Sequence, residues 1–189
     1  MQRITYDSIV KDPDARLRVK SVPLKLPLSK KDLALAKRLL RYVKDSRDDE
    51  KAEKFNLKPA VGIAAPQIGE NVQLCCVMAE DEDGHEHEYL IANPKIVSHS
   101  IQEVALSTGE GCLSIEDPYP GYVYRAKRIK VKAYDVLNAC DVELKLSDFV
   151  AIVMQHEIDH LNGILFYDRI NQENPWAKKE NAQILGESE

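Results

Sequence analysis

Residues 151–163 read Ala151-Ile152-Val153-Met154-Gln155-His156-Glu157-Ile158-Asp159-His160-Leu161-Asn162-Gly163. The pattern is that of one helix that contains His-Glu-x-x-His. Its histidines, His156 and His160, are four residues apart, so on a helix both imidazoles project from one face and can hold one metal ion. Glu157 follows the first histidine and can reach a water at the metal as a general base. The stretch therefore predicts a helix built around metal-dependent chemistry.

The ends and flanks of this helix indicate that it is buried. Ser147 fits an N-cap and Gly163 fits a C-cap. The flanking segments 149–154 and 164–166 are strongly apolar. Two imidazoles and a carboxylate in a buried helix need partners, because burying an unpaired polar group costs several kcal/mol. A metal site is therefore favoured over a chance cluster of surface charge.

Length and composition predict one domain, residues 1–189, of an ordinary globular class. The net charge of −5 argues against a nucleic-acid site, and no apolar run has membrane-spanning length. Because a secretory signal is also missing, we expect a cytoplasmic protein with reduced thiols. Residues 1–28 resemble an extended arm, and residues 171–189 a peripheral tail.

The remaining periodicity predicts an α+β domain. Ser29 begins a helix in which Leu33, Ala36, Leu40 and Val43 recur at helical spacing. The charged segment 45–58 extends this helix or forms a solvated loop. Strand-like runs occur at 71–78, 89–91, 95–101, 128–134 and 142–146. We therefore expect antiparallel strands packed around a buried late helix that carries HExxH.

Two irregular stretches contain candidate partners for that helix. The first, Pro59–Gly69, is rich in small residues and contains Gln67, whose amide could donate to an oxyanion. The second, Gly109–Ser114, contains Cys112 between glycine-rich turns. A third metal ligand is needed, and the metzincin position for it is Phe166. A downstream glutamate or an upstream cysteine remain as candidates.

Three segments together resemble the motifs of the peptide deformylase family. They are Gly62-Ile63-Ala64-Ala65-Pro66-Gln67, Glu110-Gly111-Cys112-Leu113-Ser114 and Gln155-His156-Glu157-x-x-His160. The resemblance runs from about residue 29 to residue 170. The long connection before the first motif and the acidic hairpin resemble the type 2 form of Gram-positive bacteria. Two positions depart from the family, with alanine at 60 and isoleucine at 63.

The resemblance implies a role for each motif residue. Cys112, His156 and His160 become the ligands of one divalent metal, usually Fe(II) in the family, with Ni, Co or Zn as replacements. Glu157 becomes the general acid and base. Gln67 and the backbone N–H of Leu113 become donors to the oxyanion.

The implied reaction removes the formyl group from the initiator methionine of new polypeptides and releases formate. The binding partners of the protein are then N-formylmethionyl nascent peptides. Gly62 and Gly111 become backbone contacts to the extended peptide. An apolar pocket must receive the methionine side chain, and Phe149, Ile152 and Val153 are candidates for its wall. We expect a monomer without a membrane segment. Association with the ribosome exit region, through insertions 45–58 and 80–88, is a further hypothesis.

Two rival functions remain open at this point. A gluzincin-type zinc endopeptidase would use Glu180, which lies twenty residues after His160, as its third ligand. A zinc-stabilised binding module would need no general base, so Glu157 and Gln67 would have no role in it. Such structural sites usually have four protein ligands.

Overall fold

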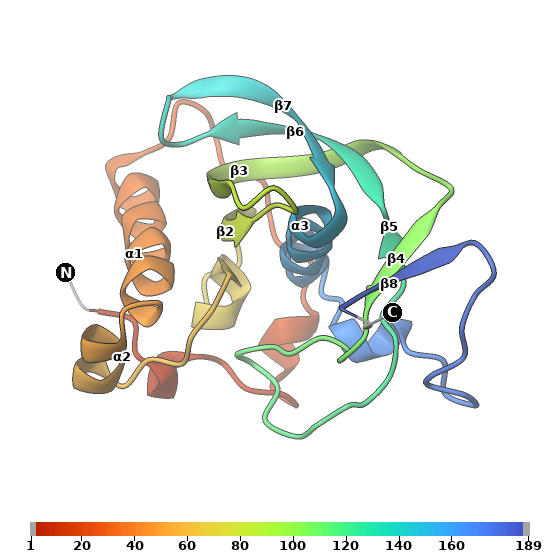
Figure 1. Cartoon of the computed structure of the whole chain (residues 1–189). Coiled ribbons are helices and arrows are strands. Elements are labelled where there is room, and N and C mark those ends of the chain that lie inside the picture. The colour runs from red at the N-terminus through yellow and green to blue at the C-terminus, as the bar shows by residue number, and fades with distance from the viewer. Residues whose placement is uncertain (1–2, 187–189) are drawn as a thin grey trace.

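A computed structural model describes residues 3–186 (Figure 1). Its α-helices are α1 (Lys30–Ser46), α2 (Asp49–Phe55) and α3 (Asp148–Leu161). Its strands are β1 (Gly62–Ala64), β2 (Leu74–Glu80), β3 (Glu86–His99), β4 (Glu103–Leu106), β5 (Arg125–Ala126), β6 (Arg128–Asp135), β7 (Cys140–Ser147) and β8 (Ala182–Leu185). This is the expected α+β fold.

The strands form two sheets. The larger has the order β1-β2-β3-β6-β7, and each neighbouring pair is antiparallel. The smaller has the order β5-β4-β8, in which β4 and β8 are parallel. Strand β1 has three buried residues and lies at one edge of the larger sheet.

Helix α3 packs against one face of the larger sheet, as Figure 1 shows. Alternate residues of β6, Ile129, Val131 and Ala133, point into this core while the residues between them are exposed. On the helix, Val150 and Met154 contact the same cluster. This alternation is what a strand with one buried face produces. The predicted late buried helix is therefore confirmed.

Helix α1 covers the other face of the sheet, where it packs over β1 and β2. Ser29 caps it as predicted, since its side chain accepts a hydrogen bond from the backbone N–H of Asp32. The buried stripe contains Leu35 and Leu39, whereas the predicted core residue Leu33 is 38% exposed. The helix has the expected period, but its buried face is rotated from the one that the sequence suggested.

The ends of α3 differ from the prediction. Ser147 occupies the N-cap position without a side-chain cap hydrogen bond, because it is still the last residue of β7. At the other end Asn162 is the C-cap, and Gly163 follows it with φ 73°. The N–H groups of Gly163 and Ile164 donate to His160 and Asp159, as in a Schellman motif.

The structure joins two of the predicted strands into one. The runs at 89–91 and 95–101 are both parts of β3, which is continuous to His99. Asn93 has φ 53°, and the register against β6 shifts between Ala92 and Lys95. A local bulge of this kind interrupts the sequence pattern without ending the strand. The charged segment 45–58 contains the end of α1 and the whole of α2.

Both terminal segments make specific contacts. In the N-terminal arm, the Ser21 N–H donates to the Leu161 carbonyl at 2.8 Å, and Val22 forms a bridge with Val72. In the C-terminal tail, β8 pairs with β4, a strand that the sequence analysis did not predict. Residues 1–2 and 187–189 of these segments lie outside the described range. Within residues 3–186 no helix has the length and hydrophobicity needed to cross a membrane.

Candidate metal centre

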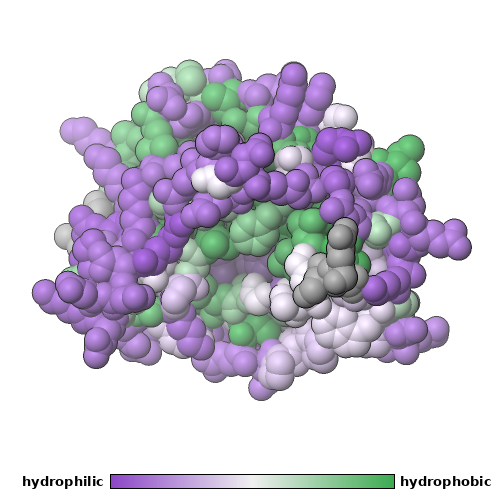
Figure 2. All heavy atoms as spheres, in the orientation of Figure 1, coloured by the Kyte–Doolittle hydropathy of each residue, from purple (hydrophilic) through white to green (hydrophobic). Residues whose placement is uncertain are grey.

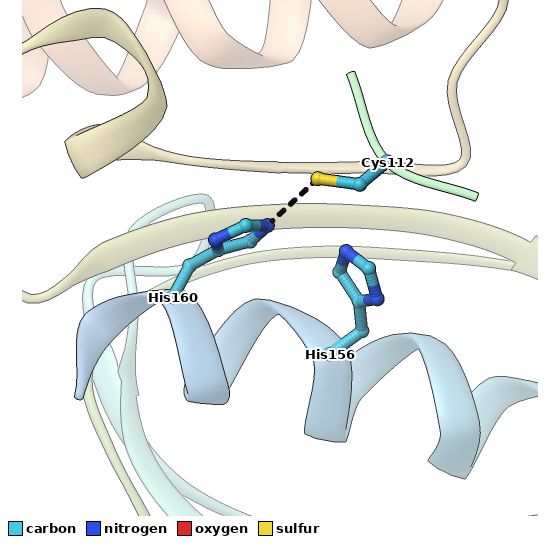
Figure 3. A group of neighbouring side chains, drawn as sticks. All are labelled: Cys112, His156 and His160. Carbon is cyan, nitrogen blue, oxygen red and sulfur yellow. Dashed lines mark hydrogen bonds between the residues drawn. The ribbon is translucent and has the colours of Figure 1, made fainter. Parts of the chain in front are cut away.

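Three predicted ligands come together in the structure. Cys112 lies in the loop after β4, and His156 and His160 project from one face of α3 (Figure 3). Their ligand atoms all lie within 4.8 Å of one another. The Cys112 Sγ is 3.2 Å from the His160 Nε2. Three converging N and S donors fit a divalent metal such as zinc or iron, and they leave a further coordination position open.

The rival third ligands do not join this group. Among residues 3–186, the metal-ligating cluster that contains both histidines includes Cys112 and no glutamate. The metzincin position is occupied by Phe166, whose ring stacks on His156 with centroids 6.2 Å apart. Phe166 is thus near the site, but it packs against a histidine and offers no ligand atom.

The Cys112 thiol and the His156 imidazole shift each other's pKa. Burial alone would raise the pKa of the Cys112 thiol, but His160 and His156 outweigh it and hold this pKa well below its ordinary value. Burial alone would lower the pKa of His156, yet Cys112 and Glu110 raise it well above normal. The site therefore favours a thiolate, which is the metal-binding form of cysteine.

A buried ionic network orients His156, and no sequence motif predicted it. Glu110 accepts a hydrogen bond from the His156 Nδ1 at 2.7 Å, which leaves Nε2 for a metal. Arg125 pairs with Glu110 at 2.5 Å and with Asp159 at 2.8 Å. Arg169 also donates to Asp159. Burial would raise the pKa of Glu110, but Arg125 and His156 lower it to about 2.

Signals for this network were present in the sequence only in part. Glu110 stands two residues before Cys112, and Asp159 is one of the variable residues of HExxH. Arg125 lies in β5, far from either motif in the chain. Its pairing with the two carboxylates depends on the tertiary fold.

Glu157 lies in a tight, buried position next to the histidines. Its residue is 3% exposed, and its Oε2 has no hydrogen-bond partner among the described residues. Burial raises the pKa of this carboxyl to about 7, with the two histidines opposing the shift. A Cβ placed on Gly62 would lie 2.4 Å from the Glu157 Oε1, so a larger residue there would displace the carboxylate. Such a group can take up and return a proton near neutral pH.

Gln67 and Leu113 present hydrogen-bond donors beside the metal ligands. The Gln67 Oε1 accepts the N–H of Ala64 at 2.9 Å, which directs Nε2 toward Cys112 and Ser114. The backbone N–H of Leu113 has no acceptor within residues 3–186, and its residue lines the adjoining cavity. Both groups are thus placed to donate to a bound oxygen.

A cavity of about 660 Å³ opens onto this cluster. Its walls contain every predicted substrate-contact residue, namely Gly62, Gly111, Phe149, Ile152 and Val153, together with Gln67, Cys112, Leu113, His156 and Glu157. In Figure 2 a hollow bordered by hydrophobic side chains opens between the positions of α1 and α3. A cavity with apolar walls and polar groups at its base suits a ligand that has an apolar side chain and a reactive polar end.

Comparison with known proteins identifies the family and its solved structures. Residues 6–176 match the family described as polypeptide deformylase. Peptide deformylase 2 of Bacillus subtilis (strain 168) is 45% identical, and the match covers 95% of this chain and 97% of that protein. The crystal structure of a peptide deformylase from Legionella pneumophila superimposes with a TM-score of 0.70 and 32% identity, covering 92% of this chain and 88% of the other.

A second solved structure adds a bound peptide. It is the Met-Ala-Ser-bound class I type b peptide deformylase from Acinetobacter baumannii. It superimposes with a TM-score of 0.67 and 30% identity, covering 86% of this chain and 96% of that one.

Proposed function

Because the chain belongs to the polypeptide deformylase family, we propose which of its residues carry out that family's reaction. The protein is a metal-dependent hydrolase that removes the N-formyl group from the initiator methionine of nascent peptides and releases formate. One observation carries the residue assignment. The Cys112, His156 and His160 donors converge at the base of an apolar cavity, with the buried Glu157 carboxyl beside them.

Cys112, His156 and His160 hold the metal ion in this proposal. Their mixed N and S donor set fits Fe(II), the metal that we propose, as well as Ni, Co or Zn. When bound, such an ion supplies Lewis acidity, which polarises a carbonyl and makes water a nucleophile at neutral pH. Glu110 holds His156 in the orientation that this requires.

Glu157 moves the proton. Its carboxylate accepts a proton from the water that attacks the formyl carbon, and it then delivers that proton to the leaving amine nitrogen. A pKa of about 7 suits both steps, because the group is neither a strong acid nor a strong base at neutral pH. Burial against Gly62 keeps the carboxylate at one place throughout.

Gln67 and Leu113 stabilise the charge that develops on the formyl oxygen. The Gln67 Nε2 and the Leu113 N–H donate to this oxygen, each from a position fixed by the fold. One such donor is typically worth about 2.7–4 kcal/mol of barrier lowering. The two residues therefore account for a substantial part of the catalysis.

The cavity selects methionine. Phe149, Ile152 and Val153 form the apolar wall that receives its side chain, while Gly62 and Gly111 contact the peptide backbone. The Met-Ala-Ser bound to the Acinetobacter baumannii relative supports a site for a peptide that begins with methionine.

We further propose the setting of this reaction. Residues 1–189 act as one catalytic domain, a monomer in the cytoplasm, on chains emerging from the ribosome. The hydrogen bonds that tie both terminal segments to the body of the protein support a single unit.

The test is to measure formate release from a formyl-Met-Ala-Ser peptide and, in parallel, cleavage of an unformylated peptide of several residues. We expect fast formate release and no internal cleavage. Internal cleavage without formate would establish the endopeptidase instead, and the absence of both activities in metal-loaded protein would favour a binding module. Metal analysis of protein purified without oxygen should find iron, and zinc alone would contradict that choice.

A further inference from the structure

A second groove, with a volume of about 480 Å³, lies at the end of the larger sheet where β3 and β7 finish and β6 begins. We call it the basic groove; its polar lining residues include Ser98, Ser100, Arg128, Lys130, Lys145 and Ser147. It shares no lining residue with the catalytic cavity. No carboxylate lines it, although the chain as a whole has a net charge of −5. The groove is therefore a local positive region on an acidic protein.

The cations of the basic groove have no counter-ions. Within residues 3–186, Arg128, Lys130 and Lys145 form no salt bridge, and all are exposed. Nearby carboxylates are already matched, since Glu143 faces Lys132 and Asp148 lies 3.3 Å from Lys127. The positive charge of the groove thus remains available to a ligand.

The strand register brings like charges together. Lys130 of β6 lies directly opposite Lys145 of β7, and Lys95 of β3 lies directly opposite Lys132 of β6. Like charges at directly opposite positions destabilise a sheet. Such an arrangement gives no benefit to the folded chain by itself, but it suits the binding of an anion that lies across several strands.

We propose that the basic groove binds the phosphodiester backbone of RNA. Lysine, arginine and serine side chains are usual donors to backbone phosphates, and with His99 they are the polar groups found here. Alternate residues such as Arg128 and Lys130 recur about every 6.6 Å along a strand, which spreads the charges in a row. This inference rests on the proposed function, in which the enzyme acts on peptides that emerge from the ribosome, an assembly rich in RNA.

A second copy of the chain is a poorer occupant. Its most acidic segment is the β2–β3 hairpin, but within residues 3–186 only Glu82 and Asp83 of its carboxylates form no salt bridge. Glu88 pairs with Lys44 at 2.8 Å, Glu86 pairs with Arg47, and Asp81 binds His87. Docking this hairpin into the basic groove would oppose three cations with two free carboxylates, unless those pairs break. An RNA backbone carries free charges at every phosphate.

The experiment measures fluorescence anisotropy of a labelled mixed-sequence RNA hairpin with the metal-loaded full chain, at salt from about 50 to 200 mM. The test variant is Lys145→Glu, and the matched control is Lys37→Glu, which makes the same charge change on the exposed side of α1. We expect binding by the wild type that weakens as salt rises. Lys145→Glu should reduce the slope of log affinity against log salt by about 1, and Lys37→Glu should leave it unchanged.

A thermal melt of the same proteins separates binding from folding. Lys145→Glu replaces a repulsive pair with an attractive one, so its midpoint should equal or exceed that of the wild type while RNA affinity falls. Equal RNA affinity of Lys145→Glu and the wild type, equal binding of a polyglutamate of the same charge, or a concentration-dependent dimer lost in Lys145→Glu would each overturn the proposal. Formate release from the short peptide is measured alongside. Normal release without RNA binding refutes this inference alone, whereas loss of release in the wild type refutes the proposed function.

Discussion

Helices α1 and α3 pack against opposite faces of the same sheet but bury different kinds of side chain. Along β2, Cys76 and Met78 contact the α1 side, while Cys75 and Val77 contact the α3 side. The buried stripe of α1 is almost entirely apolar, and its charged residues are exposed or partly exposed. Helix α3 instead buries acids and a histidine, namely Asp148, Glu157, Asp159 and His160.

The buried side chains of α1 serve only the packing of the fold, whereas several of those on α3 also serve the proposed reaction. An apolar stripe such as that of α1 is enough to hold a helix on a sheet. Buried polar groups cost free energy unless they find partners, and the Glu110 and Arg125 network supplies partners to His156 and Asp159 of α3. Two buried atoms of α3 without a hydrogen-bond partner, the Glu157 Oε2 and the His160 Nδ1, belong to residues of the proposed site.

The largest expected effect comes from removing the thiolate. Cys112→Ala should abolish metal binding and formate release, because two imidazoles alone leave the ion weakly held. Cys140→Ala removes an exposed thiol outside the cluster and is the matched control, and Glu180→Ala tests the rival ligand. Metal content and turnover are measured for all three. Full metal occupancy in Cys112→Ala, or loss of metal in Glu180→Ala, would refute the ligand assignment.

Replacing the Glu157 carboxyl should stop formate release without removing the metal. Glu157→Gln keeps the shape of the side chain but cannot accept the proton, so turnover should fall by roughly 10²–10⁴-fold. Metal content should remain that of the wild type, since Glu157 is not a proposed ligand. Lys37→Gln, an exposed position of α1, should leave turnover unaltered. A metal-free Glu157→Gln protein would mean that this glutamate is a ligand.

The buried network should contribute more to stability than an exposed pair. Arg125→Met leaves Glu110 and Asp159 without their shared partner, and breaking a buried pair in this way costs about 3–5 kcal/mol. Lys44→Met removes a partly exposed pair with Glu88 and should cost less than about 1 kcal/mol. Urea denaturation measures both free energies of unfolding. Equal costs for the two variants would show that burial of the network has little energetic consequence.

The smallest expected change in the free energy of unfolding comes from the N-cap positions of α1 and α3. Ser29 caps α1 with its side chain, so Ser29→Ala should lower the free energy of unfolding by about 1 kcal/mol. Ser147 makes no such bond to α3, and Ser147→Ala should stay within about 0.5 kcal/mol of the wild type. The same denaturation experiment compares them. A larger loss for Ser147→Ala would contradict the capping geometry described above.

The sequence predicted the local features well and the long-range ones incompletely. Spacing alone placed His156 and His160 on one helical face, and Ser29 at a helix start, because these depend on neighbouring residues. The resemblance to a family then supplied Cys112 as the third ligand. The roles of Glu110 and Arg125 were missed because their pairing joins segments that are distant in the chain.

The boundaries of strands and helices were the other source of error. Strand β3 was divided in two because a positive φ at Asn93 hides its continuity. Strand β8 was missed because its pairing with β4 is a long-range contact. Ser147 looked like a cap because its residue type is favoured there, although the preceding strand already fixes its backbone.

Strand β1 also bears on how the protein avoids aggregation. An edge strand exposes backbone hydrogen-bonding groups that can pair with any extended chain, and long edges promote self-association. Here the edge beside the catalytic cavity is three residues long. Such a short edge gives a second folded molecule little backbone to pair with, while a single extended peptide can still lie along it. The length of β1 thus limits backbone pairing between molecules at this edge, while the opposite edge, β7, is eight residues long.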